Sequence, residues 1–176
     1  MPLCGKSGDM LWLRAQGHAV LGIELSPIAV RDFYAENNLE SRTSGQGRFE
    51  RWETDGLAIL RGDFFDLAPP DLRDVAGVYD RASLIALPPP MRAHYAGHLR
   101  AILPAAAAVL LVTMEYPQEQ MTGPPFSVRE DEVRGFYEDR YAVTHLFTKD
   151  ILGESPQFRE RGLSHLVERV YHLAPR

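Results

Sequence analysis

Charged residues at the end of a predicted strand mark the first candidate site in this 176-residue chain. Asp80 and Arg81 follow the apolar run from Val75 to Tyr79 and lead into a turn of small residues. In an open α/β sheet ligands bind where strands end, so this pair could bind or polarise a ligand. A solvated surface ion pair explains the same two residues, and on the strand pattern alone it is the commoner case.

A glycine turn at Gly5 and an acid about twenty residues later give a second candidate. Glu24 closes the apolar run that begins at Ala19. From that position a carboxylate can bind both hydroxyls of a ribose, although glycine turns and strand-end acids are each common. Asp63 and Phe64 end a later strand, where an acid can face an exocyclic amine and an aromatic ring can stack on a purine. The three strand ends together suggest one nucleoside pocket.

Other residues suggest chemistry that the sequence supports less well. Gly5-Lys6-Ser7 matches the end of a phosphate-binding loop, but the glycine required five residues earlier is not present. Cys4 has no base that sequence identifies, so a core position is the better interpretation. His94 and His98 lie one helical turn apart with no third ligand at suitable spacing, so we favour a solvated helix face and predict no metal.

Composition excludes several classes of function. The net charge is −5 and the basic residues are scattered, so no cationic face is available for nucleic acid or an anionic membrane. No apolar run approaches the length of a membrane span, and the first residues lack the basic-then-apolar order of a signal peptide. A single cysteine rules out an internal disulfide. We therefore predict a soluble, cytoplasmic protein with one domain over residues 1–176.

Strands and helices alternate along the chain and then give way to two final strands. The expected elements are a helix over 9–16, a strand over 19–25, a helix from 26, strands over 57–61 and 75–79, a helix over 88–103, a strand over 108–115, a helix over 127–137, and strands near 142–148 and 163–173. Residues 41–56, rich in Ser, Gly and charge, indicate a mobile excursion. The last two strands have no helix-length insert of regular pattern between them, so we expect them to pair antiparallel. This order predicts an α/β fold with a mostly parallel sheet and an antiparallel edge.

With these residues laid out, the chain resembles the thiopurine S-methyltransferase family. Six motifs occur in the family's order and spacing over nearly the whole chain: Pro2–Ser7, Gly17–His18, Gly22–Glu24, Phe65–Leu67, Asp80–Arg81 and Gly123–Phe126. The resemblance implies a Rossmann-like class I methyltransferase sandwich, whose mostly parallel sheet ends in an antiparallel C-terminal strand. It also implies S-adenosylmethionine as cofactor, a small aromatic or heterocyclic thiol as acceptor, and a monomer without a nucleic-acid or membrane partner.

The same resemblance implies roles for individual residues. Those that it places at the cofactor are Leu3, Gly5, Glu24, Asp63, Phe64 and Arg81. Those that it places at the acceptor pocket are Pro124, Pro125 and Phe126. Glu24 would hold the ribose, while Asp63 and Phe64 would flank the adenine. Arg81 and Asp80 are the catalytic candidates, because Arg81 would favour an anionic acceptor and Asp80 would orient Arg81 or a water molecule.

The implied reaction is an in-line displacement, in which the acceptor sulfur attacks the sulfonium methyl group and S-adenosylhomocysteine leaves. No strong general base is required when the acceptor thiol is already ionised. Family members carry further residues before Pro2, so we expect a truncated chain. Two alternatives follow: an inactive remnant that binds a nucleoside or a partner chain, and an enzyme of the same fold that methylates selenium, tellurium or halide acceptors.

Overall fold

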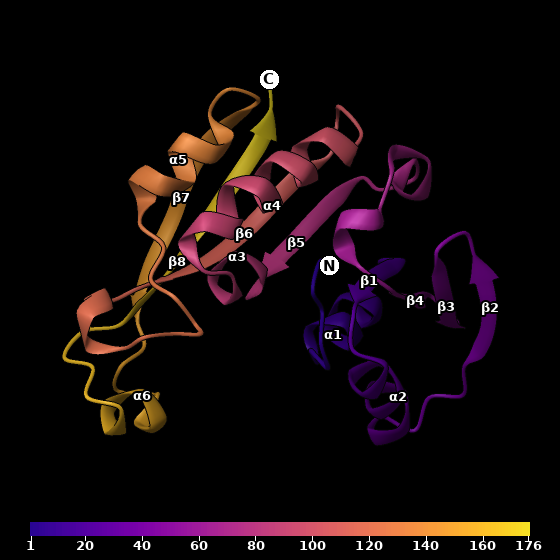
Figure 1. Ribbon diagram of the computed structural model, residues 1–176, viewed down its shortest axis with the longest axis horizontal. Coiled ribbons are helices and arrows are strands. Elements are labelled where there is room, and N and C mark those ends of the chain that lie inside the picture. The colour runs from indigo at the N-terminus through magenta and orange to yellow at the C-terminus, as the bar shows by residue number, and fades with distance from the viewer. The chain divides into compact units, whose positions relative to one another are not determined.

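The computed structural model describes all of residues 1–176, which divide into two compact units (Figure 1). The N-terminal unit comprises Met1–Leu67 and the C-terminal unit comprises Ala68–Arg176. Each unit contains its own four-stranded sheet. None of the helices combines the length and the apolar character needed to pass through a lipid bilayer. The single domain over residues 1–176 stays a prediction.

The N-terminal unit is built on a sheet with strand order β1-β4-β3-β2. Its elements are α1 (Asp9–Ala15), β1 (Val20–Glu24), α2 (Pro27–Glu36), β2 (Arg42–Gln46), β3 (Phe49–Thr54), β4 (Leu57–Arg61) and the 3-10 helix η1 (Phe64–Asp66). Strands β1 and β4 pair in parallel, and α1 and α2 both contact them. Helix α2 starts where the sequence predicts, because the Ser26 hydroxyl oxygen accepts a hydrogen bond from Ala29 N at 3.2 Å and Pro27 occupies the first helical position.

Cys4 lies in the hydrophobic core of the N-terminal unit. The buried members of this core are Cys4, Met10, Val20, Val30, Phe33, Tyr34, Leu57 and Ile59. A Cβ atom added at Gly22 would lie 2.7 Å from Cys4 Sγ, so glycine at this position of β1 leaves room for the sulfur. The prediction of a core position for Cys4 is confirmed.

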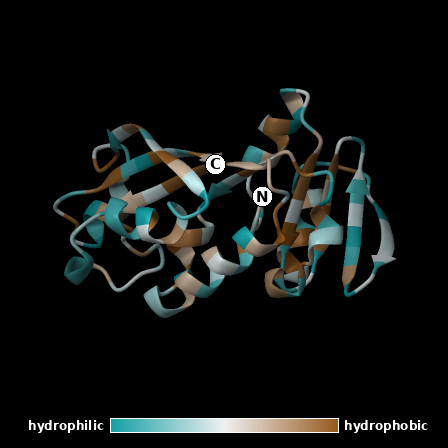
Figure 2. Ribbon diagram, turned by 90° about the horizontal axis from the view of Figure 1, so that it is seen from above, coloured by the Kyte–Doolittle hydropathy of each residue, from teal (hydrophilic) through white to brown (hydrophobic).

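We expected residues 41–56 to form a mobile excursion, and this prediction is wrong. The stretch contains an antiparallel hairpin formed by β2 and β3. Strand β3 also pairs antiparallel with β4. The two connecting turns contain Gly47 and Gly56, whose φ angles of +59° and +69° glycine adopts without steric cost. The hairpin's outer strand β2 is exposed, and Figure 2 shows the outermost strands mostly in the hydrophilic and neutral colours. The stretch therefore lacks the apolar pattern by which strands are recognised.

The C-terminal unit has the strand order β5-β6-β8-β7. Its elements are η2 (Pro69–Leu72), β5 (Gly77–Arg81), α3 (Ser83–Ala86), α4 (Pro89–Ile102), β6 (Ala108–Glu115), η3 (Gln118–Gln120), α5 (Glu130–Tyr137), β7 (Tyr141–Asp150), α6 (Pro156–Glu160) and β8 (Val167–Pro175). Helix α5 contacts both α4 and β7 (Figure 1). The predicted antiparallel pairing of the last two strands is confirmed.

The strand pairing corrects the expectation of one mostly parallel sheet. Each unit has a mixed sheet with a single parallel pair, which is β1 with β4 in one unit and β5 with β6 in the other. The remaining pairs are antiparallel. In the N-terminal unit the reason is the unrecognised β2–β3 hairpin. In the C-terminal unit the reason is that β8 inserts between β6 and β7.

Candidate active site

The glycine turn and Glu24 meet in the N-terminal unit, as their spacing predicts. Gly5 N donates a hydrogen bond to Glu24 Oε2 at 2.9 Å, and Ser26 N donates one to Glu24 Oε1 at 2.7 Å. The turn has positive φ angles at Leu3 (42°) and Gly5 (52°). A Cβ atom added at Gly5 would meet nothing within 4 Å, so the turn's backbone faces open space. A ligand can therefore approach the backbone beside the carboxylate.

Backbone hydrogen bonds to β1 hold the turn in this position. The Met1 amino group donates to Leu21 O at 2.7 Å, and Ile23 N donates to Met1 O at 3.1 Å. Cys4 N then donates to Ile23 O at 3.0 Å. The first residues thus run beside β1, and the turn that follows them lies at the strand end that carries Glu24.

Asp63 lies at the neighbouring strand end. Strand β4 pairs in register with β1, and Gly62 N donates a hydrogen bond to Glu24 O at 3.0 Å. The exposed Asp63 accepts a hydrogen bond from Phe65 N on Oδ1 at 2.9 Å. The Phe64 ring, by contrast, is only 3% exposed and packs edge-on against Phe65. Stacking of Phe64 on a purine stays a prediction, and the structure places that ring inside the unit.

Two exposed apolar side chains soon after Glu24 in the sequence were not recognised as site candidates. We expected the buried strand to include Leu25, but β1 ends at Glu24 and Leu25 is 63% exposed. Ile28, in the first turn of α2, is 60% exposed. An apolar side chain directly after a strand-end acid was the available signal. Together these residues offer an apolar surface next to a polar anchor, which is the composition of small-ligand sites.

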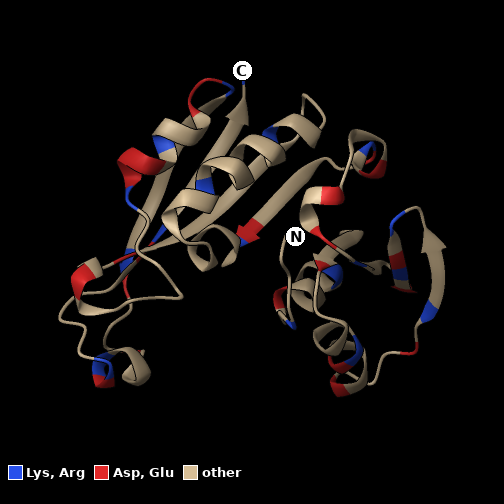
Figure 3. Ribbon diagram, in the orientation of Figure 1, with Lys and Arg blue, Asp and Glu red and all other residues tan.

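At the end of β5 the structure separates Asp80 from Arg81. Successive strand residues point to opposite faces. Asp80 is completely buried and accepts a hydrogen bond from Tyr95 Oη at 2.7 Å. The Arg81 side chain is 47% exposed and forms an ion pair with Glu168 Oε1 at 3.8 Å. Figure 3 shows these opposite charges at the tip of β5. Only the arginine is thus placed on a surface.

Burial raises the pKa of the Asp80 carboxyl, while hydrogen bonds from Tyr95 and Ser83 act in the opposite direction. Ala82, two residues after Asp80, has a φ of 77° and directly precedes α3. Asp80 is therefore a buried anchor for the turn that presents Arg81. The predicted role of Asp80 in orienting Arg81 or water stays a prediction.

The proline loop over residues 123–126 is fixed by its neighbours in the C-terminal unit. Phe126 N donates a hydrogen bond to Ile85 O at 2.6 Å, and Tyr116 Oη donates one to Pro125 O at 2.6 Å. Gly123 has a φ of +80°, and a Cβ atom there would lie 2.4 Å from the Phe126 ring. The loop thus closes on its own aromatic residue, with Pro124 and Pro125 between.

Arg92 is a further buried charge that sequence reasoning missed. It lies on α4, is 1% exposed, and its Nη1 donates to both carboxylate oxygens of Glu132 on α5 at 2.8 Å. Its Nε donates to Leu87 O at 2.9 Å, and its guanidinium carbon lies 5.8 Å from the centre of the Phe126 ring. No local sequence pattern predicts the pairing of Arg92 with Glu132, because 40 residues separate them.

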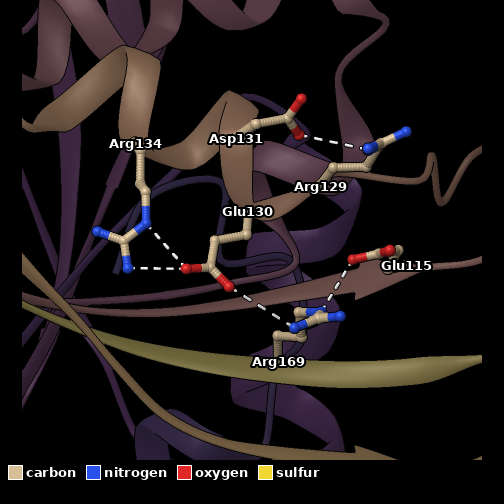
Figure 4. A pocket seen from close by; sticks show the side chains of 6 residues that line it. All are labelled: Glu115, Arg129, Glu130, Asp131, Arg134 and Arg169. Carbon is tan, nitrogen blue, oxygen red and sulfur yellow. Dashed lines mark hydrogen bonds and ion pairs between the residues drawn. The ribbon is translucent and has the colours of Figure 1, made fainter.

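An open pocket in the C-terminal unit is lined entirely by charged residues (Figure 4). These are Glu115, Arg129, Glu130, Asp131, Arg134 and Arg169. Each arginine faces an acid: Arg134 lies 2.7 Å from Glu130, Arg169 lies 2.8 Å from Glu115, and Arg129 lies 3.3 Å from Asp131. Because the charges balance, this pocket has no preference for an anionic ligand. No group of three or more His, Cys, Asp or Glu side chains is arranged to hold a metal ion.

Comparison with known sequences identifies close relatives. Residues 1–176 match the family model described as thiopurine S-methyltransferase. The chain is 49% identical over 176 residues to the thiopurine S-methyltransferase of Nitrosospira multiformis, covering 100% of this chain and 80% of that protein. It is 50% identical over 173 residues to the thiopurine S-methyltransferase of Pseudomonas aeruginosa, covering 98% of this chain and 79% of that protein.

Comparison with solved structures identifies the fold. The YcgJ protein of Bacillus subtilis matches with a TM-score of 0.68 and 10% identity, over 99% of this chain and 90% of that one. A SAM-dependent methyltransferase from Anabaena variabilis matches with a TM-score of 0.65 and 12% identity, over 99% of this chain and 75% of that one. The α/β class I methyltransferase fold predicted from the sequence is therefore confirmed at the level of the class.

Proposed function

Because the chain belongs to the thiopurine S-methyltransferase family, we propose that its N-terminal unit holds the cofactor and its C-terminal unit orders a small aromatic or heterocyclic thiol. The reaction is transfer of a methyl group from S-adenosylmethionine to sulfur. The observation that carries the proposal is the contact between Gly5 N and the Glu24 carboxylate at 2.9 Å, which joins the glycine turn to the strand-end acid.

The groups at the end of β1 suit the nucleoside end of S-adenosylmethionine. Each Glu24 oxygen accepts one backbone hydrogen bond and retains a lone pair, so the carboxylate can also accept both ribose hydroxyls. Leu3 and Gly5 border the open space beside it. Asp63 has a second carboxylate oxygen for the adenine amine, and Leu25 offers apolar surface to the ring. When bound, S-adenosylmethionine supplies a methyl group that its sulfonium charge activates.

The C-terminal unit supplies charge and shape for the acceptor. Arg81 is exposed enough to attract an anionic sulfur, and a nearby guanidinium lowers the pKa of a thiol, so more of the acceptor is present as the reactive thiolate. The loop of Pro124, Pro125 and Phe126 forms a wall of the acceptor pocket in this proposal. Because its neighbours already fix that loop, it is ordered before the acceptor binds, which favours productive orientation.

Asp80 acts in this scheme from inside the unit. Its carboxylate is bonded to Tyr95 and positions the turn that carries Arg81, without touching the reacting atoms. We further propose that the protein acts as a monomer with one domain, and that it is cytoplasmic, where its single, buried cysteine stays reduced. Light scattering on the purified protein tests the monomer.

The test of the proposed function compares Arg81→Ala and Arg81→Lys in methylation of 6-mercaptopurine, chosen as a thiopurine. We expect Arg81→Ala to lower kcat/KM by about 10- to 100-fold, because a charged group at the reacting sulfur is lost, and Arg81→Lys to recover part of it. Arg129→Ala is the control, since that arginine is 72% exposed and pairs only with a neighbouring acid. Unchanged kcat/KM in Arg81→Ala would exclude the role given to Arg81.

A further inference from the structure

We propose that Arg92 and Glu132 form a positioning pair that holds the Phe126 ring, and that this pair sets the affinity for the acceptor rather than the rate of methyl transfer. The inference rests on the proposed function, because it takes Phe126 as a wall of the acceptor pocket. It adds Arg92, which is distant in sequence from the proline loop, and Glu132, which follows the loop on α5, to the groups that determine acceptor binding.

The guanidinium of Arg92 is fixed in one orientation. Its Nη1 is bonded to both oxygens of Glu132 at 2.8 Å, and its Nε is bonded to Leu87 O at 2.9 Å. These contacts come from α5 and from Leu87, the residue that follows α3. Because the group is planar and held on two edges, it can neither rotate nor withdraw without breaking a charge-assisted hydrogen bond.

One face of this fixed group is turned to the Phe126 ring. The distance of 5.8 Å from the guanidinium carbon to the ring centre lies within the range of cation–π attraction, which strengthens where water is excluded. Gly123 leaves the space that the ring occupies, and Phe126 N is bonded to Ile85 O at 2.6 Å. Arg92, Gly123 and Ile85 therefore define the position of the ring together.

Stability alone is a poor account of this pair. A buried ion pair often contributes little net stability, because removing two charges from water costs about as much as their attraction returns. Arg92 Nη2 is buried without a hydrogen-bond partner, which adds to that cost. The pair does supply a fixed geometry. It fixes the position of the Phe126 ring, which belongs to the proposed acceptor loop.

The chain contains a matched control pair on the same helix. Arg100, two turns after Arg92 on α4, forms an ion pair with Asp139, which follows α5. This pair also joins α4 to the region of α5, through a hydrogen bond from Arg100 Nη1 to Asp139 Oδ1. Asp139→Asn therefore removes a carboxylate that pairs with an arginine of the same helix α4, at a more exposed position away from Phe126.

The first experiment measures KM and kcat for 6-mercaptopurine in Glu132→Gln, Arg92→Lys and Asp139→Asn, with the affinity for S-adenosylhomocysteine from calorimetry. We expect Glu132→Gln and Arg92→Lys to raise KM by about three- to tenfold at unchanged kcat and unchanged cofactor affinity. Glu132→Gln preserves the size of the side chain, so it provides the test if Arg92→Lys does not fold. A fall in kcat at constant KM, or an equal rise of KM in Asp139→Asn, overturns the proposal.

The second experiment asks whether Arg92 acts through the ring, by combining Arg92→Lys with Phe126→Leu. We expect Phe126→Leu to raise KM and the added Arg92→Lys to have no further effect, because the ring that it positions is gone. If the effects of the two substitutions on KM multiply in the double variant, the inference is overturned, but the proposed role of the acceptor loop is not. An unchanged KM in Phe126→Leu removes the loop from the acceptor pocket, and the inference with it.

Discussion

The two units hold their candidate groups by different means. In the N-terminal unit, Glu24 is partly exposed at a strand end and is held by backbone N–H groups of Gly5 and Ser26. In the C-terminal unit, the buried Asp80 and Arg92 each bond to a side chain of a distant element as well as to groups nearby in sequence, with 15 residues separating Asp80 from Tyr95 and 40 separating Arg92 from Glu132. The first arrangement leaves the charged group open to a ligand, whereas the second uses buried charge to position a different residue.

This difference predicts different consequences of mutation. Changing a group held by the backbone should weaken ligand binding with a limited effect on folding, because the turn and the strand retain their ladder bonds. Changing a group that fixes other side chains should alter stability and acceptor binding together.

Glu24→Ala tests the group held by the backbone. We expect affinity for S-adenosylhomocysteine to fall by roughly 100-fold, because two hydrogen bonds to a charged carboxylate are lost. Isothermal titration calorimetry measures the affinity, and thermal unfolding shows whether folding is preserved. Glu53→Ala is the control, since Glu53 is an exposed residue of β3 paired with Arg51. If both variants bind equally well, Glu24 does not hold the ribose.

Gly123→Ala tests the loop fixed by side-chain packing. A Cβ atom would lie 2.4 Å from the Phe126 ring at a φ of +80°, so we expect a loss of about 1–3 kcal/mol in the free energy of unfolding and a higher acceptor KM. Gly135→Ala on α5 is the control: a Cβ there meets nothing within 4 Å, and alanine stabilises a helix by about 0.5–1 kcal/mol. Denaturant unfolding distinguishes them, and equal stability of the two variants would contradict the packing argument.

Asp80→Asn gives the smallest expected effect and one that depends on pH. Because the folded-state pKa of Asp80 is raised, the unfolded chain releases this proton first as the pH increases. The contribution of Asp80 to the unfolding free energy therefore falls as the pH rises from its ordinary pKa to its raised pKa. Asparagine does not titrate, so its contribution stays constant. We expect the unfolding free energy of the wild type relative to Asp80→Asn to fall as the pH rises above about 4, the ordinary pKa of an aspartate. A difference that stays constant or rises with pH would show that hydrogen bonding to the carboxylate outweighs its burial.

The sequence predicted the apolar part of the fold better than the polar part. Strands β4 and β6 and the start of α2 follow directly from apolar runs and from Ser26-Pro27. The β2–β3 hairpin was missed because exposed edge strands need no apolar alternation. For β3 the pair Asp55-Gly56 was an available signal, since Asp-Gly favours a two-residue turn between two strands and here connects β3 to β4.

The candidate site was predictable where one strand and one turn are enough to position the residues. Glu24 and Gly5 were paired from spacing alone, and the structure brings them together. Burial was not predictable for Phe64, because nothing in the neighbouring sequence indicates that its ring faces the interior. Arg92 illustrates the same limit, because its function depends on packing among α4, α5 and the proline loop rather than on its neighbours in sequence.

Cys4 has a practical consequence for an enzyme that handles thiols. It is the only cysteine in the chain, it is 5% exposed, and burial raises the pKa of its thiol to about 12. A protonated, enclosed sulfur reacts slowly with electrophiles and disulfides. The folded protein should therefore resist mixed disulfides with its own acceptors, and a colorimetric thiol reagent can follow acceptor consumption with little background from the enzyme.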